Sequence, residues 1–172
     1  MAILPIKTVP DPVLRQKAKR IKSIDKSVRK LISDMQETLF TASGVGLAAN
    51  QVGQTLRLIV LNVSGADCKV VINPEVTRRI GSRVVNEGCL SIPGYIGEIK
   101  RSELVRVKGQ DARGREIKIK ADGLLAEVLE HEIDHLNGIL YTDHLESPEK
   151  FRKLEPPQKA AETTTDKTSV AE

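Results

Sequence analysis

Aromatic residues and cysteines are scarce in this sequence. Its 172 residues include no tryptophan, two tyrosines and two phenylalanines, so the aromatic platforms on which single-stranded nucleic acids stack are almost absent. The formal net charge of +4 is also too small to indicate direct nucleic-acid specificity. Because two cysteines, Cys68 and Cys89, are too few for a disulfide framework, we expect both to be thiols in a reducing compartment.

Long hydrophobic runs are absent as well. No apolar run approaches the roughly 18 residues of a membrane span, and the densest, residues 58–61, is typical of a buried strand. Near the start, Pro5 and Lys7 interrupt the chain before the apolar region of a signal peptide forms. We therefore expect a cytoplasmic protein without membrane contact, and the length suits one domain.

The first part of the chain predicts a basic segment followed by an amphipathic helix. Residues 15–30 hold eight Lys or Arg and one acid, Asp25. We interpret this stretch as a solvated helix face, with a docking patch for an acidic or RNA-rich partner as the alternative. Apolar residues then recur at helical spacing from residue 28 to residue 39, with Asp25 or Ser27 as the N-cap and an end near Gly44.

The middle of the chain predicts short strands, and a second helix follows them. Apolar runs separated by glycine, asparagine and proline lie at residues 56–63, 69–72 and 84–85. Residues 104–108 and 116–120 alternate apolar and charged side chains around a turn at residues 111–114, which is typical of a hairpin with one solvated face. The second helix runs from residue 124 to residue 136, between Asp122 as its cap and Gly138 as its stop. Helices that are separate from antiparallel strands predict an α+β fold.

Two of the three histidines lie four residues apart in the second predicted helix, as His131-Glu132-Ile133-Asp134-His135. Four residues advance a helix by about 6 Å and little more than one turn, so both imidazoles leave the same face and can hold one metal ion. Glu132 lies beside the first ligand and is the natural proton acceptor for a water next to the ion. The pattern therefore predicts hydrolytic chemistry.

The third ligand has several candidates. Tyr141 stands where a metzincin protease would need its third histidine, so that interpretation fails. Glu155 lies in a polar stretch that would not hold it rigidly, and His144 lies beyond the helix stop. Cys89 is the strongest candidate, because it follows a glycine and because one thiolate with two imidazoles leaves a tetrahedral position open for water.

Three segments of the sequence together resemble the motifs of peptide deformylase, in the same order. They are Gly44-Val45-Gly46-Leu47-Ala48-Ala49-Asn50-Gln51, Glu87-Gly88-Cys89-Leu90-Ser91 and His131-Glu132-Ile133-Asp134-His135. The resemblance extends from about residue 9 to residue 145. It implies an enzyme that removes the formyl group from the N-terminal formylmethionine of newly synthesised polypeptides. It also implies a fold in which small antiparallel β-sheets surround the helix that carries the two histidines.

The resemblance also implies roles for individual residues. Those of the metal site are Cys89, His131 and His135 as ligands, Glu132 as general base and then acid, and Gln51 with the backbone N–H of Leu90 as donors to the oxyanion. Those of the substrate site are Val45, Gly46 and Gly88, which would pair with the substrate backbone, and Val128, which would line the methionine pocket. Glu87 and Arg101 resemble an ion pair that steadies the cysteine loop.

The remaining expectations concern the metal, the partners and the domain limits. The resemblance implies Fe²⁺, which Ni²⁺, Co²⁺ or Zn²⁺ can replace, and a monomer acting on N-formylmethionyl peptides and nascent chains with at most transient ribosome contact. We predict one catalytic domain over residues 1–147 and a polar, disordered tail over residues 148–172. Because that tail is nearly neutral, residues 15–30 are the better candidate for electrostatic contact with the ribosome. The alternatives are a zinc metallopeptidase using His144 or Glu155, and a non-catalytic ribosome- or peptide-binding relative that kept the scaffold.

Overall fold

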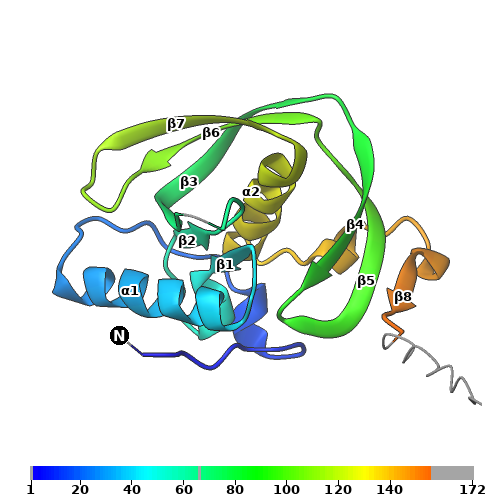
Figure 1. Cartoon of the computed structure of the whole chain (residues 1–172), viewed down its shortest axis with the longest axis horizontal. Helices are drawn as coiled ribbons and strands as arrows, with labels where there is room; N and C mark the ends of the chain where they lie inside the picture. Colours follow the sequence, from blue (N-terminus) through cyan, green and yellow to red (C-terminus); the bar gives the residue numbers. More distant parts are fainter. Residues whose placement is uncertain (1, 66, 156–172) are drawn as a thin grey trace, which may run out of the picture.

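A long central helix lies between two antiparallel sheets (Figure 1). The computed structural model describes residues 2–65 and 67–155. The larger sheet has the order β1-β2-β3-β6-β7, with β1 at Gly46–Ala48, β2 at Leu58–Leu61, β3 at Lys69–Ile80, β6 at Leu104–Gln110 and β7 at Glu116–Asp122. The smaller sheet has the order β4-β5-β8, with β4 at Arg83–Cys89, β5 at Ile92–Arg101 and β8 at Phe151–Lys153. The predicted α+β fold is confirmed.

The central helix, α2 (Gly123–Leu136), carries the histidine motif. Its apolar side chains pack on the inward residues of the larger sheet, among them Val105 and Val107. The helix is followed by Gly138, whose φ of 74° is left-handed and where a Cβ would lie 2.5 Å from the carbonyl oxygen of Arg15. Only glycine fits this stop. Because α2 is buried on nearly all sides from Val128 onward, its polar side chains are held inside the protein.

The first helix, α1 (Lys26–Thr41), covers the end of the larger sheet where β1 and β2 lie. The backbone N–H of Val28 donates to Asp25 Oδ1 at 3.0 Å, so Asp25 is the cap. Met35 and Leu39 are fully buried and belong to the same core as Leu47 of β1. This helix therefore fixes the strand that borders the site described below.

The basic segment before α1 differs from the prediction. A short 3₁₀ turn, η1 (Pro12–Arg15), is followed by non-helical chain up to Asp25. The backbone N–H groups of this chain bond to neighbours instead, as when Ala18 N donates to Leu136 O at 2.8 Å and Lys19 N donates to Thr55 O at 2.9 Å. The interpretation of residues 15–30 as a helix face is thus wrong for most of that stretch. Its backbone groups form hydrogen bonds with segments that are distant in the sequence, and not with one another as in a helix.

The expected domain limit at residue 147 is too early. A 3₁₀ turn, η4 (Pro148–Lys150), leads into β8, which pairs with β5 in the register Tyr95↔Lys153 and Gly97↔Phe151. Phe151 stacks on Tyr95 with ring centroids 4.9 Å apart, and this aromatic pair holds the strand to the sheet. The rest of the predicted tail, residues 156–172, lies outside the described residues. In the part of the chain that the structure describes, no helix is long and apolar enough to cross a membrane.

Candidate metal centre and substrate cleft

Three ligand side chains converge between α2 and the smaller sheet. His131 and His135 leave α2 one turn apart, and their ring centroids are 4.9 Å apart. Cys89 approaches from the end of β4, where its Sγ lies 3.2 Å from His135 Nε2. One ligand atom from each of the three residues lies within 4.8 Å of the other two. The structure thus brings Cys89, the strongest predicted third ligand, to the two histidines.

A bulge in the smaller sheet aims the cysteine. The pairing of β4 with β5 shifts between Gly88 and Cys89, so that Cys89 lies opposite Ile92. Such an irregularity redirects a side chain at the end of a strand. Two donors then fix the sulfur, because Ser91 N lies 3.4 Å and Gln51 Nε2 lies 3.6 Å from Sγ.

A buried ion-pair network holds His131 from behind. His131 Nδ1 lies 2.7 Å from Glu87 Oε2, which leaves Nε2 for the cluster. Arg101 forms a two-pronged contact with Glu87, at 2.6 and 3.0 Å, so the predicted Glu87–Arg101 pair is present. Burial opposes ionisation of Glu87, but its bonds with His131 and Arg101 lower its pKa to about 2. An ionised carboxylate that orients a ligand histidine is typical of metal sites.

The network continues to the surface through Asp134 and His144, and the sequence did not indicate that these two residues form a pair. Arg101 donates to Asp134 Oδ2 at 2.6 Å, and His144 Nε2 lies 2.8 Å from the same oxygen. His144 is therefore engaged away from the cluster, and among the described residues the candidate metal-binding group comprises Cys89, His131 and His135. Its partner, Asp134, lies inside the histidine motif, and this position is the only feature of the sequence that points to a role for Asp134 at the site.

The donor set fits a single divalent ion. One thiolate and two imidazoles suit Fe²⁺, Co²⁺, Ni²⁺ and Zn²⁺ alike. Burial lowers the pKa of His135 well below its usual value, so this ring is in the neutral form that a metal binds. For His131, burial lowers the pKa, but the bonds with Cys89 and Glu87 outweigh this effect and raise the pKa well above the usual value.

Glu132 is a buried carboxylate of the cleft. Burial raises its pKa to about 7, and Oε2 has no hydrogen-bond partner among the described residues. Gly46 of β1 packs directly against it, because a Cβ at Gly46 would lie 2.9 Å from Glu132 Cδ and 2.7 Å from Val128 Cγ1. The absence of a side chain at Gly46 is therefore what leaves room for Glu132.

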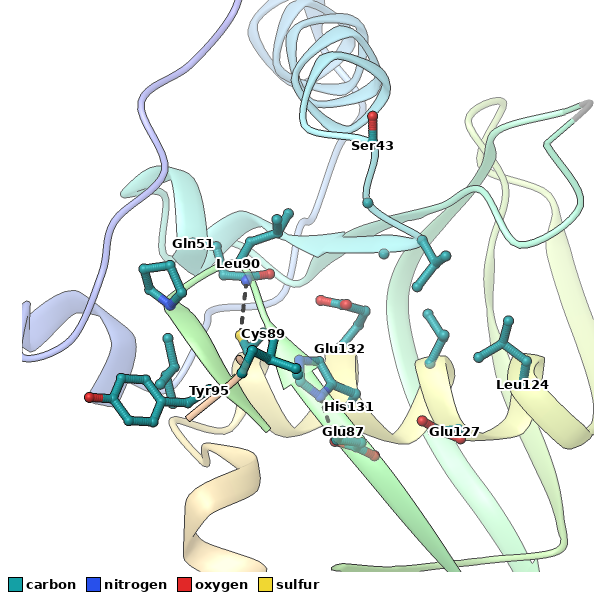
Figure 2. Close-up of a pocket in the computed structure, with 18 of the residues that line it drawn as sticks. Ser43, Gln51, Glu87, Cys89, Leu90, Tyr95, Leu124, Glu127, His131 and Glu132 are labelled. Atoms are coloured by element: carbon teal, nitrogen blue, oxygen red, sulfur yellow. Dashed lines mark hydrogen bonds and ion pairs between the residues drawn. The ribbon is translucent and has the colours of Figure 1, made fainter. Parts of the chain in front are cut away.

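Gln51 and Leu90 lie beside the Cys89 sulfur, and a dashed line in Figure 2 marks the contact of Gln51 with it. Gln51 belongs to the 3₁₀ turn η2 (Ala49–Val52) and is buried. Its Oε1 accepts from Ala48 N at 2.9 Å, and its Nε2 donates to Ser91 Oγ at 3.2 Å. These contacts fix the amide with its N–H groups toward the cluster. Ser91, which takes part in this orientation, was not foreseen.

A cavity of about 510 Å³ opens over the cluster. Nine of the ten predicted site residues line it: Val45, Gly46, Gln51, Gly88, Cys89, Leu90, Val128, His131 and Glu132. The tenth, His135, lies beneath it with only 1% of its surface exposed. The rim adds Tyr95, Leu124 and Leu154, which the motifs did not indicate. These roles remain predictions, but the residues do meet at one place.

The fold and this site define a class, the metal-dependent hydrolases in which a His-Glu-x-x-His helix carries two ligands and a carboxylate. The family model described as "Polypeptide deformylase" matches residues 3–151. The chain belongs to the peptide deformylase family, as the resemblance of its motifs predicted.

Relatives and solved structures agree with this assignment. The chain is 52% identical over 157 residues to a peptide deformylase of Dehalococcoides mccartyi (strain CBDB1), covering 91% of this chain and 94% of the relative. It is 51% identical over 160 residues to that of Thermodesulfovibrio yellowstonii, covering 89% and 96%. The crystal structure of a peptide deformylase from Legionella pneumophila matches with a TM-score of 0.83 at 45% identity, over 87% of this chain and 89% of that one. A peptide deformylase from Synechococcus elongatus in complex with actinonin matches with a TM-score of 0.82 at 43% identity, over 86% and 81%.

The activity follows from the family. The protein is a hydrolase that removes the N-formyl group from nascent peptides. The family is metal-dependent, and the cluster of Cys89, His131 and His135 is the group in the described chain that can hold the ion.

Proposed function

We propose that Cys89, His131 and His135 hold one Fe²⁺ ion, for which Ni²⁺, Co²⁺ or Zn²⁺ can substitute. The donor set and the Glu87 carboxylate behind His131 support this proposal. Bound there, a divalent ion supplies Lewis-acid polarisation and lowers the pKa of an adjacent water.

Glu132 acts as the proton carrier of the reaction. Its carboxylate accepts a proton from the water that attacks the formyl carbon, and it returns this proton to the amine nitrogen as the C–N bond breaks. The products are formate and a peptide with a free methionine amine. The burial of Glu132, its unpartnered Oε2 and a pKa raised to about 7 support this role.

Gln51 and the backbone N–H of Leu90 stabilise the negative charge that develops on the former formyl oxygen. The support is the fixed amide of Gln51, whose Oε1 is held by Ala48 N so that Nε2 is the end that faces the cluster. A preorganised donor of this kind needs no rearrangement when the charge appears.

The substrate lies between two sheet edges. β1 and β4 are the outer strands of their sheets, and residues beside both line the cavity. An extended peptide therefore pairs with Val45, Gly46 and Gly88 as an added strand. Val128, on the α2 wall of the cavity, lines the pocket for the methionine side chain.

We also infer a cytoplasmic monomer that meets nascent chains through transient ribosome contact, with a single catalytic domain that includes β8. Both cysteines are free thiols, which supports a reducing compartment.

The observation that carries the proposal is the convergence of the three ligand atoms beside Glu132. The test is formate release by anaerobically purified protein, with its metal content measured, from formyl-Met-Ala-Ser and from the unformylated peptide. We expect formate from the first peptide alone, and none after treatment with a chelator. Cleavage of an internal peptide bond in either substrate, or formate release that survives full metal removal, would contradict the proposal.

A further inference from the structure

Like charges face one another across the solvent side of the larger sheet. In the register of β6 with β7, Arg106 lies opposite Lys120 and Lys108 lies opposite Lys118. In the register of β3 with β6, Arg78 lies opposite Arg106. Opposed like charges on antiparallel strands destabilise a sheet. This arrangement therefore opposes folding, so its role is to be sought outside the fold.

The five residues, which we call the cationic face (Arg78, Arg106, Lys108, Lys118 and Lys120), are all exposed. The side chains between them, such as Val107 and Ile119, point inward onto the core of α2. Within the described chain, the one ion pair of the cationic face joins Lys108 to Glu75 at 3.2 Å.

The acidic residues of β7 do not neutralise the centre of this face. Glu116 and Asp122 lie at the two ends of the strand, opposite Gln110 and Leu104. The protein's net charge of +4 is modest, but the structure gathers five cations on this one surface of the sheet.

We propose that the cationic face binds the phosphate backbone of double-helical RNA without reading its sequence. Adjacent strands lie about 4.8 Å apart and alternate residues about 6.8 Å apart along a strand, so the face presents a compact array of cations to a polyanion. Lys and Arg that neutralise phosphates supply such binding through released counterions. No aromatic residue belongs to the face, so it does not stack unpaired bases.

The position of the face suits an enzyme of nascent chains. The cationic face is the outer side of the sheet whose inner side packs on α2, while the cavity lies between α2, β1 and the smaller sheet (Figure 1). RNA bound there leaves the cleft open. The choice of RNA among polyanions rests on the proposed function, because nascent peptides emerge from an RNA-rich particle.

The test combines charge reversal with a matched control in the full-length, metal-loaded protein. In Lys118→Glu/Lys120→Glu, the new carboxylates lie opposite Lys108 and Arg106 of β6. We therefore expect the melting temperature to rise. The control, Lys22→Glu/Lys26→Glu, changes the net charge equally at two exposed lysines of the basic stretch, residues 15–30. Lys118→Gln/Lys120→Gln serves as a second variant that introduces no new ion pair.

The measurement is fluorescence anisotropy of a labelled, blunt-ended RNA duplex over a series of salt concentrations. We expect the sheet variant to lose at least about tenfold in affinity and to lower the salt slope by about 2, one for each lysine, while the control keeps most of its binding. Formate release from formyl-Met-Ala-Ser stays at the wild-type rate in all variants, which separates this proposal from that for the catalytic site.

Three results would overturn the proposal: no binding of the duplex by the wild type at low salt, equal loss of affinity in the sheet variant and the control, or tighter binding of poly-glutamate than of RNA. The second result would assign RNA binding to net charge or to the basic stretch, residues 15–30, and the third would assign the face to an acidic protein.

Discussion

Replacing Gly46 by alanine should displace Glu132 without unfolding the protein. The new Cβ would lie 2.7 Å from Val128 Cγ1 and 2.9 Å from Glu132 Cδ, whereas carbon atoms pack at about 3.5–4.0 Å. Both side chains must therefore move by about 1 Å. Because β1 is held by β2 and α1, the side chains of α2 move, and the carboxylate of Glu132 moves with them. A displacement of this size in a catalytic group lowers kcat by about 10²-fold.

The assay is formate release from formyl-Met-Ala-Ser over a range of substrate concentrations, with metal content and melting temperature measured on the same samples. Gly88→Ala, at the other glycine proposed to pair with the substrate, is the matched control for kcat, because a Cβ there lies 3.5 Å from Tyr95 O and 3.7 Å from Ile96 Cγ2, which are ordinary contacts. Any effect of this variant on substrate pairing is expected in KM alone. We expect the metal content of both variants to equal that of the wild type and kcat to fall in Gly46→Ala alone. A kcat for Gly46→Ala within about threefold of the wild type, against the 10²-fold loss expected, would show that Gly46 does not set the position of Glu132.

Three further predictions concern the residues around the ligands. Glu132→Gln should retain the metal but lower kcat by about 10²–10⁴-fold, because the proton carrier is lost; unchanged pre-steady-state and steady-state formate release would contradict this role. Gln51→Met should lower kcat by about 10²-fold with a small effect on KM, as measured in the same assay; a rise in KM alone would instead indicate a role in substrate binding. In chelated protein, Glu87 should stabilise the fold most above pH 4.5, its ordinary pKa, and this contribution of roughly 3 kcal/mol should be lost as the pH falls toward its folded-state pKa of about 2. Urea unfolding at neutral and acidic pH should show a smaller acid-induced loss of stability in Glu87→Gln than in the wild type, and equal losses would refute the assignment.

Local patterns predicted the parts of the fold that local interactions determine. The apolar spacing in α1, its Asp25 cap and the alternation along β6 and β7 depend on neighbours a few residues away, and the structure contains all three. The extended course of residues 16–25 was not predicted, because it depends on pairing with distant backbone groups such as Thr55 O and Leu136 O. The strand β8 was missed for a similar reason, since its polar sequence becomes ordered only by pairing with β5.

The candidate site likewise has a part that local patterns predicted and a part that they did not. Helix geometry alone placed His131 and His135 on one face, but the convergence of Cys89 depends on a bulge at the end of a separate sheet. Cys89 was predicted as a ligand from the resemblance of the motifs. No local signal linked Asp134 to Arg101 and His144, because these positions lie 33 and 10 residues away along the chain and meet only in the folded protein.

Metal coordination by Cys89, His131 and His135 can be measured by X-ray absorption spectroscopy of the metal-loaded protein, recorded at the edge of the bound metal for the wild type and for Cys89→Ser. We expect one sulfur and two imidazole nitrogens around the metal in the wild type, and loss of the sulfur in the variant. A wild-type spectrum with nitrogen and oxygen neighbours alone, or a sulfur neighbour that persists in Cys89→Ser, would contradict this coordination.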